Sequence, residues 1–430
     1  MNLVVKGAKY MDNISACIEA LSAGNLEKAY QLMDIIQKTG SDEEKEAFAY
    51  ELFDLGFLQE AEKLVKDLLE NFPDEGELLI LLAEIYVNDD KINDALLVLD
   101  KITMADLVYP QALVLQAELY EREALFEVSE KKLLEAEKLL PTEPVIQFAL
   151  AELYFSIGKL HEAVYKYEQV LKTEDEIAGI NIHERLANVY SAAGEFEKAL
   201  PYYEQAEVAK LTVDVLFGHG LTAFQAGYHE AAVEKFIEVT QLDPDFESVY
   251  LYLAKAYEHQ DLIEEGFESV KAGLSVNPFQ KELYFLGGKL ATKLGKVNEA
   301  KEMLNKALNL DPSYVEAIMT LNQISFTEND YAEVMERTIP ALEEGEEDPY
   351  LLWDLAIACE KEERYLESLN YYRQAYNFFK TNEEFLQNYG FFLLEEGNIG
   401  ESIEVFKQLQ KMNPANLEYA DVLERLSESL

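Results

Sequence analysis

Apolar and polar residues follow one another along this chain with the spacing of amphipathic helices, and the pattern recurs about every 34 residues. Residues 150–167 superpose on residues 186–203 at an offset of 36, with leucine, alanine, tyrosine and glycine at matching places. Repeats counted in this way begin at residues 10, 42, 76, 110, 144, 180, 213, 247, 281, 315, 349 and 383. A fixed period of this length predicts an array of helix pairs rather than two or three globular domains.

Small residues and turn residues recur at fixed places in each repeat. Two antiparallel helices, here called A and B, approach closely only where a small side chain leaves room. Repeat position 8 is alanine or glycine in ten of the twelve repeats, with Cys17 and Asn322 as the exceptions. Glycine at position 15 suits the left-handed cap of helix A, and proline at position 32 suits the end of helix B. The position-15 glycines are Gly24, Gly56, Gly158, Gly194, Gly227, Gly295 and Gly397.

These positions resemble the tetratricopeptide repeat, whose pattern has small residues at positions 8, 20 and 27, an aromatic residue at 11 or 24 and proline at 32. The resemblance implies an all-α fold of about 25 helices without a sheet, a right-handed superhelical solenoid of tetratricopeptide-type helix pairs with a C-terminal capping helix. We expect an N-terminal extension at 1–9, tandem repeats at 10–414 and the capping helix at 415–430. The repeat at 315–348 departs most from the pattern and is the expected hinge. Two extra residues near 173–179 predict a longer loop.

Composition narrows the partners and the location. With 83 acidic residues against 36 basic ones the formal net charge is −47, which disfavours nucleic acid and anionic membrane surfaces as partners. No apolar run approaches the roughly 20 residues of a membrane-spanning helix. The first ten residues also lack the apolar core of a secretion signal, so a cytoplasmic location is expected. Cys17 and Cys359 lack metal-ligand spacing and are expected in the core.

Motifs that would indicate catalysis are absent from the sequence. There is no phosphate-binding loop, dinucleotide fingerprint, zincin helix or hydrolase nucleophile turn. None of the five histidines has a second ligand three or four residues away, as a metal site on a helix would need. The acidic run at 343–348 lacks the alternating ligands of a calcium loop. We therefore expect no enzymatic activity, no cofactor and no metal.

The A helices of such a solenoid line its concave face, so repeat positions 2, 5, 9 and 12 predict a continuous groove. Early repeats place aromatic and acidic residues there, Glu46 among them, and later repeats place lysines. The predicted groove residues are Tyr50, Phe53, Glu84, Glu118, Phe148, Glu152, Phe155, Glu184, Asn188, Phe217, Phe224, Lys255, Phe285, Lys289 and Trp353. Because Glu84, Glu118 and Glu152 share position 9, they are expected to meet every third residue of an extended ligand. A basic and apolar extended protein or peptide segment is the expected partner.

The expected function is that of an adaptor or scaffold that binds partner polypeptides in this groove. Two alternatives stay open: a regulatory sensor that responds to a short peptide, and a non-catalytic subunit of an enzyme complex. Some members of the resembled family bind the C-terminal carboxylates of chaperones. The nearest candidates for that role, Arg185, Asn188, Lys255 and Lys289, do not follow the required order. The oligomeric state stays open.

Overall fold

In the computed structural model the described residues are 13–343, 345 and 348–428, and the chain divides into two compact units, Met1–Lys210 and Leu211–Leu430. We call these unit 1 and unit 2. The predicted extension at 1–9 lies outside the described residues, as do residues 344 and 346–347 of the predicted hinge and acidic run. The hinge stays a prediction.

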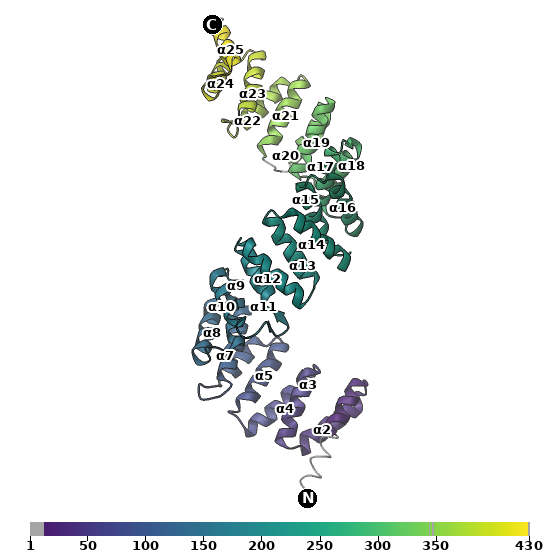
Figure 1. Ribbon diagram of the computed structural model, residues 1–430, viewed down its shortest axis with the longest axis vertical. Coiled ribbons are helices and arrows are strands. Elements are labelled where there is room, and N and C mark those ends of the chain that lie inside the picture. Colours follow the sequence, from purple (N-terminus) through teal and green to yellow (C-terminus); the bar gives the residue numbers. More distant parts are fainter. Residues whose placement is uncertain (1–12, 344, 346–347, 429–430) are drawn as a thin grey trace. The chain divides into compact units, whose positions relative to one another are not determined.

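Unit 1 contains six helix pairs, and its first A helix includes the helical residues 13–22 (Figure 1). Its other helices are α2 (Leu26–Thr39), α3 (Asp42–Asp54), α4 (Leu58–Asn71), α5 (Gly76–Asn88), α6 (Ile92–Leu99), α7 (Tyr109–Arg122), α8 (Phe126–Leu139), α9 (Pro144–Ser156), α10 (Leu160–Val170), α11 (Ile182–Ala192) and α12 (Phe196–Ala209).

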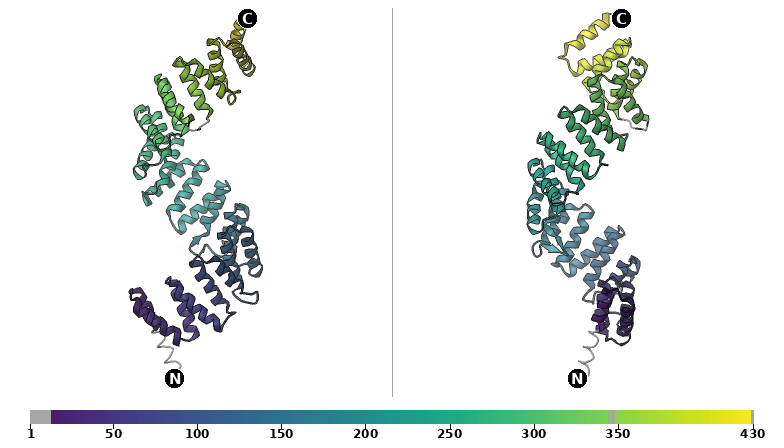
Figure 2. Two further views of the ribbon diagram at one scale, coloured as in Figure 1. Left: turned by 180° about the vertical axis from the view of Figure 1, so that it is seen from behind. Right: turned by 90° about the vertical axis from the view of Figure 1, so that its right-hand side faces the viewer.

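Unit 2 contains six further pairs and a terminal helix, which Figure 2 shows from two more directions. Its helices are α13 (Val213–Gln225), α14 (His229–Leu242), α15 (Glu247–His259), α16 (Ile263–Val276), α17 (Lys281–Lys293), α18 (Val297–Leu310), α19 (Val315–Glu328), α20 (Tyr331–Glu343), α21 (Pro349–Lys361), α22 (Tyr365–Tyr376), α23 (Glu383–Glu395), α24 (Ile399–Met412) and α25 (Leu417–Glu428). From α3 onward, each A helix begins within two residues of the predicted start of its repeat. The all-α fold of repeated helix pairs is therefore confirmed.

One expectation about the fold is wrong, because the described residues include a small sheet. Strands β1 (Glu176–Ile177) and β2 (Ile180–Asn181) pair antiparallel. Ala178 and Gly179 between them have φ values of 48° and 82°, and two positive φ angles characterise the tight turn that matches the twist of a hairpin. The hairpin occupies the loop that the sequence predicts to be longer.

The small residues at position 8 lie where helix A crosses helix B. A Cβ atom on Gly220 would lie 2.7 Å from the Phe236 ring, and one on Gly288 would lie 2.5 Å from Cγ of Leu304. Cys17, which occupies position 8 of the first repeat, is fully buried, and so is Cys359 elsewhere in the chain. Burial raises the pKa of each thiol to about 11. Close packing thus accounts for these positions, as predicted.

Asn322, the other exception at position 8, is fully buried and forms a polar cluster between α19, α20 and α21. Its amide nitrogen donates to Oγ1 of Thr338 at 3.0 Å and to Oδ2 of Asp354 at 2.9 Å. Its amide oxygen accepts from Nη1 of Arg337 at 2.7 Å. Burial raises the pKa of Asp354 to about 6, with the carboxylate of Asp348 as a smaller cause in the same direction.

Helix α25 covers the last pair of unit 2, as the predicted capping helix should. It buries Tyr419, Val422 and Leu426 against the apolar side chains of α23 and α24. The Tyr419 hydroxyl also donates to Oε1 of Glu383 at 2.9 Å. The cap therefore removes an apolar face that would otherwise contact water.

The turn after helix A keeps one backbone geometry in all twelve repeats. The seven position-15 glycines have φ between 70° and 83°. The same position is also left-handed in the five repeats that lack glycine there, where Asp90, Ala124, Asp261, Asn329 and Glu363 have φ between 56° and 59°. At Ala124 the turn is held by the backbone N–H of Leu125, which donates to the carbonyl of Tyr120 at 2.8 Å. The backbone hydrogen bonds impose the conformation, and glycine only makes it less costly.

We therefore expect Ala124→Gly to raise the free energy of unfolding by about 1 kcal/mol, because the left-handed conformation strains every residue except glycine. Urea denaturation followed by circular dichroism would measure the change. The matched variant is Gly158→Ala, where an added Cβ meets no atom within 4 Å and only backbone strain is introduced. The free energy of unfolding of Gly158→Ala should fall by a similar amount. An Ala124→Gly protein that is no more stable than the parent would contradict the prediction.

Candidate partner-binding site

Carboxylates and one tyrosine gather on the A helices α3, α5 and α7 of unit 1. Glu46, Tyr50 and Asp54 follow one another at four-residue spacing on α3, so they share one face of that helix. With carboxylates of α5 and α7 they form a set that we call the acidic strip. The acidic strip consists of Glu46, Tyr50, Asp54, Glu77, Glu84 and Glu118.

Electrostatic repulsion within the acidic strip raises the pKa of three of its members, Glu46, Tyr50 and Glu84. Burial raises the pKa of Glu46, and the carboxylate of Glu77 raises it further. Burial and Asp54 raise the pKa of Glu84 in the same way. The pKa of the Tyr50 phenol is raised by burial and then by three neighbouring carboxylates. Among described residues no lysine or arginine forms an ion pair with Glu46, Glu77 or Glu84, so their negative charge is available to a ligand.

The three glutamates that share repeat position 9, Glu84, Glu118 and Glu152, differ in their partners. Glu118 is exposed and pairs with Nη2 of Arg122 at 2.8 Å. Glu152 pairs with Nε of Arg185 at 3.1 Å and also accepts a hydrogen bond from the Tyr167 hydroxyl. Glu152 is already bonded to two neighbouring side chains, and Glu118 pairs with Arg122. Glu84 is therefore the glutamate whose negative charge is least neutralised by a neighbouring cation.

The predicted aromatic residues of unit 1 are mostly half-buried. Tyr50 is 37% exposed, more than the other three. Phe53 is half-buried and packs against the hydrophobic core of unit 1. Phe148 meets the Tyr167 ring edge-on at 6.1 Å, and Phe155 is partly buried on the same helix. Tyr50 is therefore the most exposed of these four aromatic side chains.

Helix α11 contributes two predicted groove residues that have structural partners. The amide oxygen of Asn188 accepts a hydrogen bond from the Tyr203 hydroxyl at 2.7 Å. Glu184 lies partly buried in the first turn of α11. Asn188 belongs to unit 1, whereas Lys255 and Lys289 belong to unit 2. The structure does not bring these three together within one unit.

In unit 2, the two predicted aromatic residues of α13 both pack against α15. Phe217 lies 5.8 Å and Phe224 lies 6.3 Å from the Tyr252 ring, measured between ring centroids. Nζ of Lys255 lies 5.5 Å from the same Tyr252 ring, within the range of a cation–π contact. Phe217 also contacts Phe236 of α14, so its ring is partly used for packing.

The remaining predicted residues of unit 2 fall into exposed and buried positions. Lys289 is exposed and pairs with Glu258, and Phe285 packs at 5.3 Å against the Tyr314 ring. Trp353 is only 9% exposed and packs at 5.4 Å from the Phe379 ring. Its ring is therefore mostly part of the core.

Two members of the acidic strip, Asp54 and Glu77, are missing from the residues predicted from sequence. Glu77 occupies repeat position 2, which the groove prediction includes, so the register alone could have identified it. Asp54 lies one helical turn beyond Tyr50, and this spacing was the available signal.

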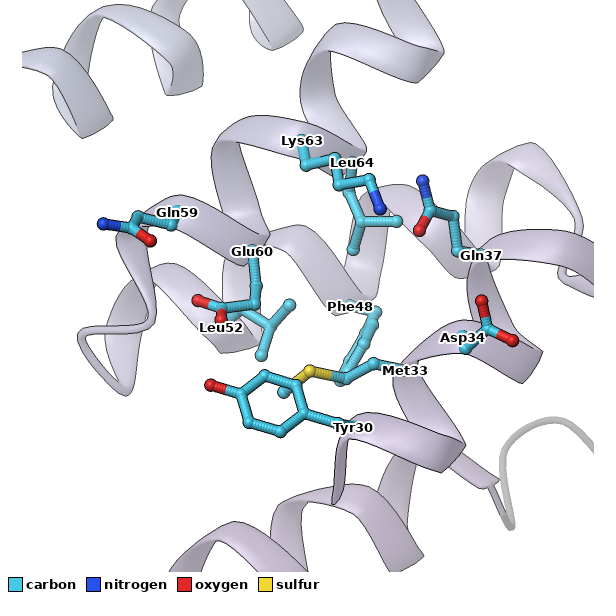
Figure 3. A pocket seen from close by; sticks show the side chains of 10 residues that line it. All are labelled: Tyr30, Met33, Asp34, Gln37, Phe48, Leu52, Gln59, Glu60, Lys63 and Leu64. Carbon is cyan, nitrogen blue, oxygen red and sulfur yellow. The ribbon is translucent and has the colours of Figure 1, made fainter. Parts of the chain in front are cut away.

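A separate pocket of about 410 Å³ lies between α2, α3 and α4 (Figure 3). Met33, Phe48, Leu52 and Leu64 supply its apolar surface, and polar side chains such as Glu60 surround them. None of the residues that line it belongs to the acidic strip.

Neither a metal site nor a membrane span is found in the described part of the chain. No three side chains of histidine, cysteine, aspartate or glutamate converge there as metal ligands. Among the helices of residues 13–343 and 348–428, none combines the length and the apolar composition needed to cross a bilayer.

Paired helices with small residues at their crossing points, repeated at this period, define a tetratricopeptide repeat protein. Models of that repeat match residues 52–119, 182–211 and 282–314. Two more specific models, described as YpiA-like tetratricopeptide repeats and YpiA-like C-terminal tetratricopeptide repeats, match residues 123–175 and 349–416. This chain belongs to the YpiA-like family of tetratricopeptide repeat proteins.

The family assignment rests on similarity to one bacterial protein over nearly the whole chain. The TPR repeat-containing protein YpiA of Bacillus subtilis (strain 168) is 37% identical over 415 residues, which cover 96% of this chain and 98% of that protein. The TPR repeat-containing protein MJ1428 of Methanocaldococcus jannaschii is 22% identical, over 63% of this chain and 46% of its own. The solved C-terminal part of a TPR repeat-containing protein from Cytophaga hutchinsonii is similar with a TM-score of 0.49 and 16% identity, over 56% of this chain and 98% of its own. The repeats and the family support a protein-interaction scaffold in general.

Proposed function

We propose that this protein is a non-catalytic interaction scaffold whose acidic strip binds an extended, positively charged segment of a partner polypeptide. The observation that carries the proposal is the group of carboxylates around Tyr50. They raise the pKa of Glu46, Tyr50 and Glu84, and no described lysine or arginine forms an ion pair with Glu46, Glu77 or Glu84. Lysine or arginine side chains of a ligand would relieve that repulsion. The charge of the strip thus selects the charge of its partner.

Charge and apolar contact have different roles in this proposal. Stacked A helices lie roughly 8–10 Å apart, and an extended chain advances about 3.3 Å per residue, so cations at every third ligand residue would meet successive helices. Exposed ion pairs contribute only about 0.2–1 kcal/mol each, and they mainly set orientation and association rate. Tyr50 supplies the ring against which an apolar ligand side chain packs, and it is the expected main source of affinity.

We expect the triple variant E46Q/E77Q/E84Q to bind a cationic peptide about tenfold more weakly at low ionic strength, because three ion pairs of about 0.5 kcal/mol are lost. The probe is a labelled, acetylated and amidated peptide with lysine at every third position and leucine between. Fluorescence anisotropy titrations of the full chain at low and high salt would measure the affinity. The salt dependence should flatten in the variant, whereas Tyr50→Ala should weaken binding at both salt concentrations.

The matched control is E70Q/E127Q/E204Q, which removes the same three charges from exposed positions on the B helices α4, α8 and α12 of unit 1. It should bind the peptide as the parent does. Equal weakening by both triple variants would mean that only the net charge of the chain attracts the peptide, and the proposed site would be wrong.

A further inference from the structure

The A helices of unit 2 carry a cluster of lysines, which has no part in the binding proposed for the acidic strip. Lys289 and Lys293 lie one turn apart on α17, and both pair with Oε1 of Glu258 on α15, at 2.9 and 2.7 Å. The Glu258 side chain is 13% exposed, whereas the two lysines are 46% and 44% exposed. The carboxylate is thus covered, and the two ammonium groups are held beside each other at the surface.

A third ammonium group extends this cluster toward the preceding repeat. Lys255 occupies on α15 the repeat position that Lys289 occupies on α17. We call Lys255, Lys289 and Lys293, together with Glu258, the lysine face. Three cations and one carboxylate give this face a net charge of +2, in a chain whose formal net charge is −47. The positive charge is therefore local and opposite in sign to the charge of the rest of the protein.

Nearby carboxylates on α17 do not cancel this charge. Glu282 is in the first turn of α17, seven residues before Lys289. At 1.5 Å per residue this is roughly 10 Å along the helix, about one Debye length at 0.1 M salt. The pKa of Glu258 is lowered by hydrogen bonds from Lys293 and Lys289 against the effect of its burial, so this carboxylate stays ionised and keeps the two lysines in place.

We propose that the lysine face is a second binding site, which takes an extended polypeptide segment carrying acidic side chains at about every third residue. The three ammonium groups are distributed over two A helices, and a single terminal carboxylate could bridge Lys289 and Lys293 but would leave Lys255 unmatched. A spacing of three residues in the ligand matches the roughly 8–10 Å between packed helices. The half-buried ring of Phe285 on α17 offers an apolar contact to the residues between. Unit 2 thus selects a ligand charge opposite to the one that we propose for unit 1.

The test uses the full chain and a labelled, acetylated and amidated peptide with glutamate at every third position and leucine between. The parent should bind it despite its own net negative charge, and the double variant K289E/K293E should bind it at least about tenfold more weakly at low ionic strength. A second peptide, with glutamine in place of glutamate and a free C-terminal carboxylate, distinguishes a terminal carboxylate from acidic side chains. It should bind more weakly than the acidic peptide.

The matched control is K271E/K306E, which makes the same charge change on the B helices α16 and α18 at lysines of similar exposure, 44% and 48%. It should leave the affinity for the acidic peptide within about twofold. Circular dichroism verifies folding, and Lys289→Gln and Lys293→Gln replace the double variant if it loses helix. Failure of the acidic peptide to bind, equal weakening by both variants, or tighter binding of the glutamine peptide would overturn the proposal. Titration of the same variants with the cationic peptide reports on unit 1 separately, so failure of one site is distinguishable from failure of the other.

Discussion

Replacing Gly288 by leucine is expected to lower the free energy of unfolding of unit 2 by about 3 kcal/mol. The new Cβ atom would lie 2.5 Å from Cγ of Leu304 and 3.3 Å from the carbonyl oxygen of Ala300, and both neighbours are fully buried on α18. Helix α18 would have to move away from α17, which opens contacts along the whole pair. Leucine stabilises a helix relative to glycine by about 1 kcal/mol. The measured loss in the free energy of unfolding is therefore the cost of the steric strain minus this gain in helix propensity.

The control for this substitution is Gly400→Leu, because a Cβ atom at Gly400 in α24 meets no atom within 4 Å. Its stability should be unchanged or slightly higher than that of the parent. Urea unfolding followed by far-ultraviolet circular dichroism would measure both variants. Equal stability of the two proteins would show that the crossing of α17 and α18 tolerates a large side chain, contrary to the packing described above.

Asp354→Asn is expected to stabilise the protein above pH 6 by up to about 3 kcal/mol. The folded pKa of Asp354 is raised from 3.8 to about 6 by burial. A carboxyl group whose pKa is raised on folding favours the folded state below its unfolded pKa, and this contribution is lost as the pH rises through about 6. At pH 8 the ionised group therefore costs about 1.4 kcal/mol for each unit of the shift. Asparagine carries no charge, and its amide oxygen can still accept from Asn322.

Unfolding free energies measured from pH 4 to pH 8 would check this prediction. The advantage of the Asp354→Asn protein should be near zero at the acidic end and should grow through pH 6. Asn322→Ala gives the opposite comparison, because it restores the residue most repeats have at position 8 but removes the donor to Asp354. It should destabilise the protein more at pH 8 than at pH 5. A pH-independent difference between Asp354→Asn and the parent would contradict the role of this carboxyl group.

The repeat period predicts the helix pairs because their packing is local. Each A helix contacts its own B helix at a position fixed by the sequence, such as Gly288 against Leu304, so the register follows from residue types alone. The same period locates the turns at Ala124 and Glu363, which have no glycine signal. The strands at 176–177 and 180–181 were not predicted, since two residues are too few to show an alternating pattern.

The candidate site could be predicted only in part, because register tells which way a side chain points and not what it meets. Glu84 and Glu152 occupy the same repeat position, yet Glu152 is bonded to Arg185 from the next repeat. Trp353 also occupies a predicted groove position, but aromatic neighbours such as Phe379 bury it. Pairing and burial of this kind depend on residues about 30 positions away, and no single repeat contains that information.

The division of the chain after Lys210 has a consequence for synthesis on the ribosome. Unit 1 is complete in its own six helix pairs, and it emerges first. At roughly 5–20 residues per second, translation of residues 211–430 takes on the order of 10–40 s. Helix pairs form their contacts with near neighbours in far less time than that. A nascent chain would therefore present a finished acidic strip while the lysine face is still untranslated. The cationic segment that we propose for unit 1 would thus find its site before the acidic segment that we propose for unit 2.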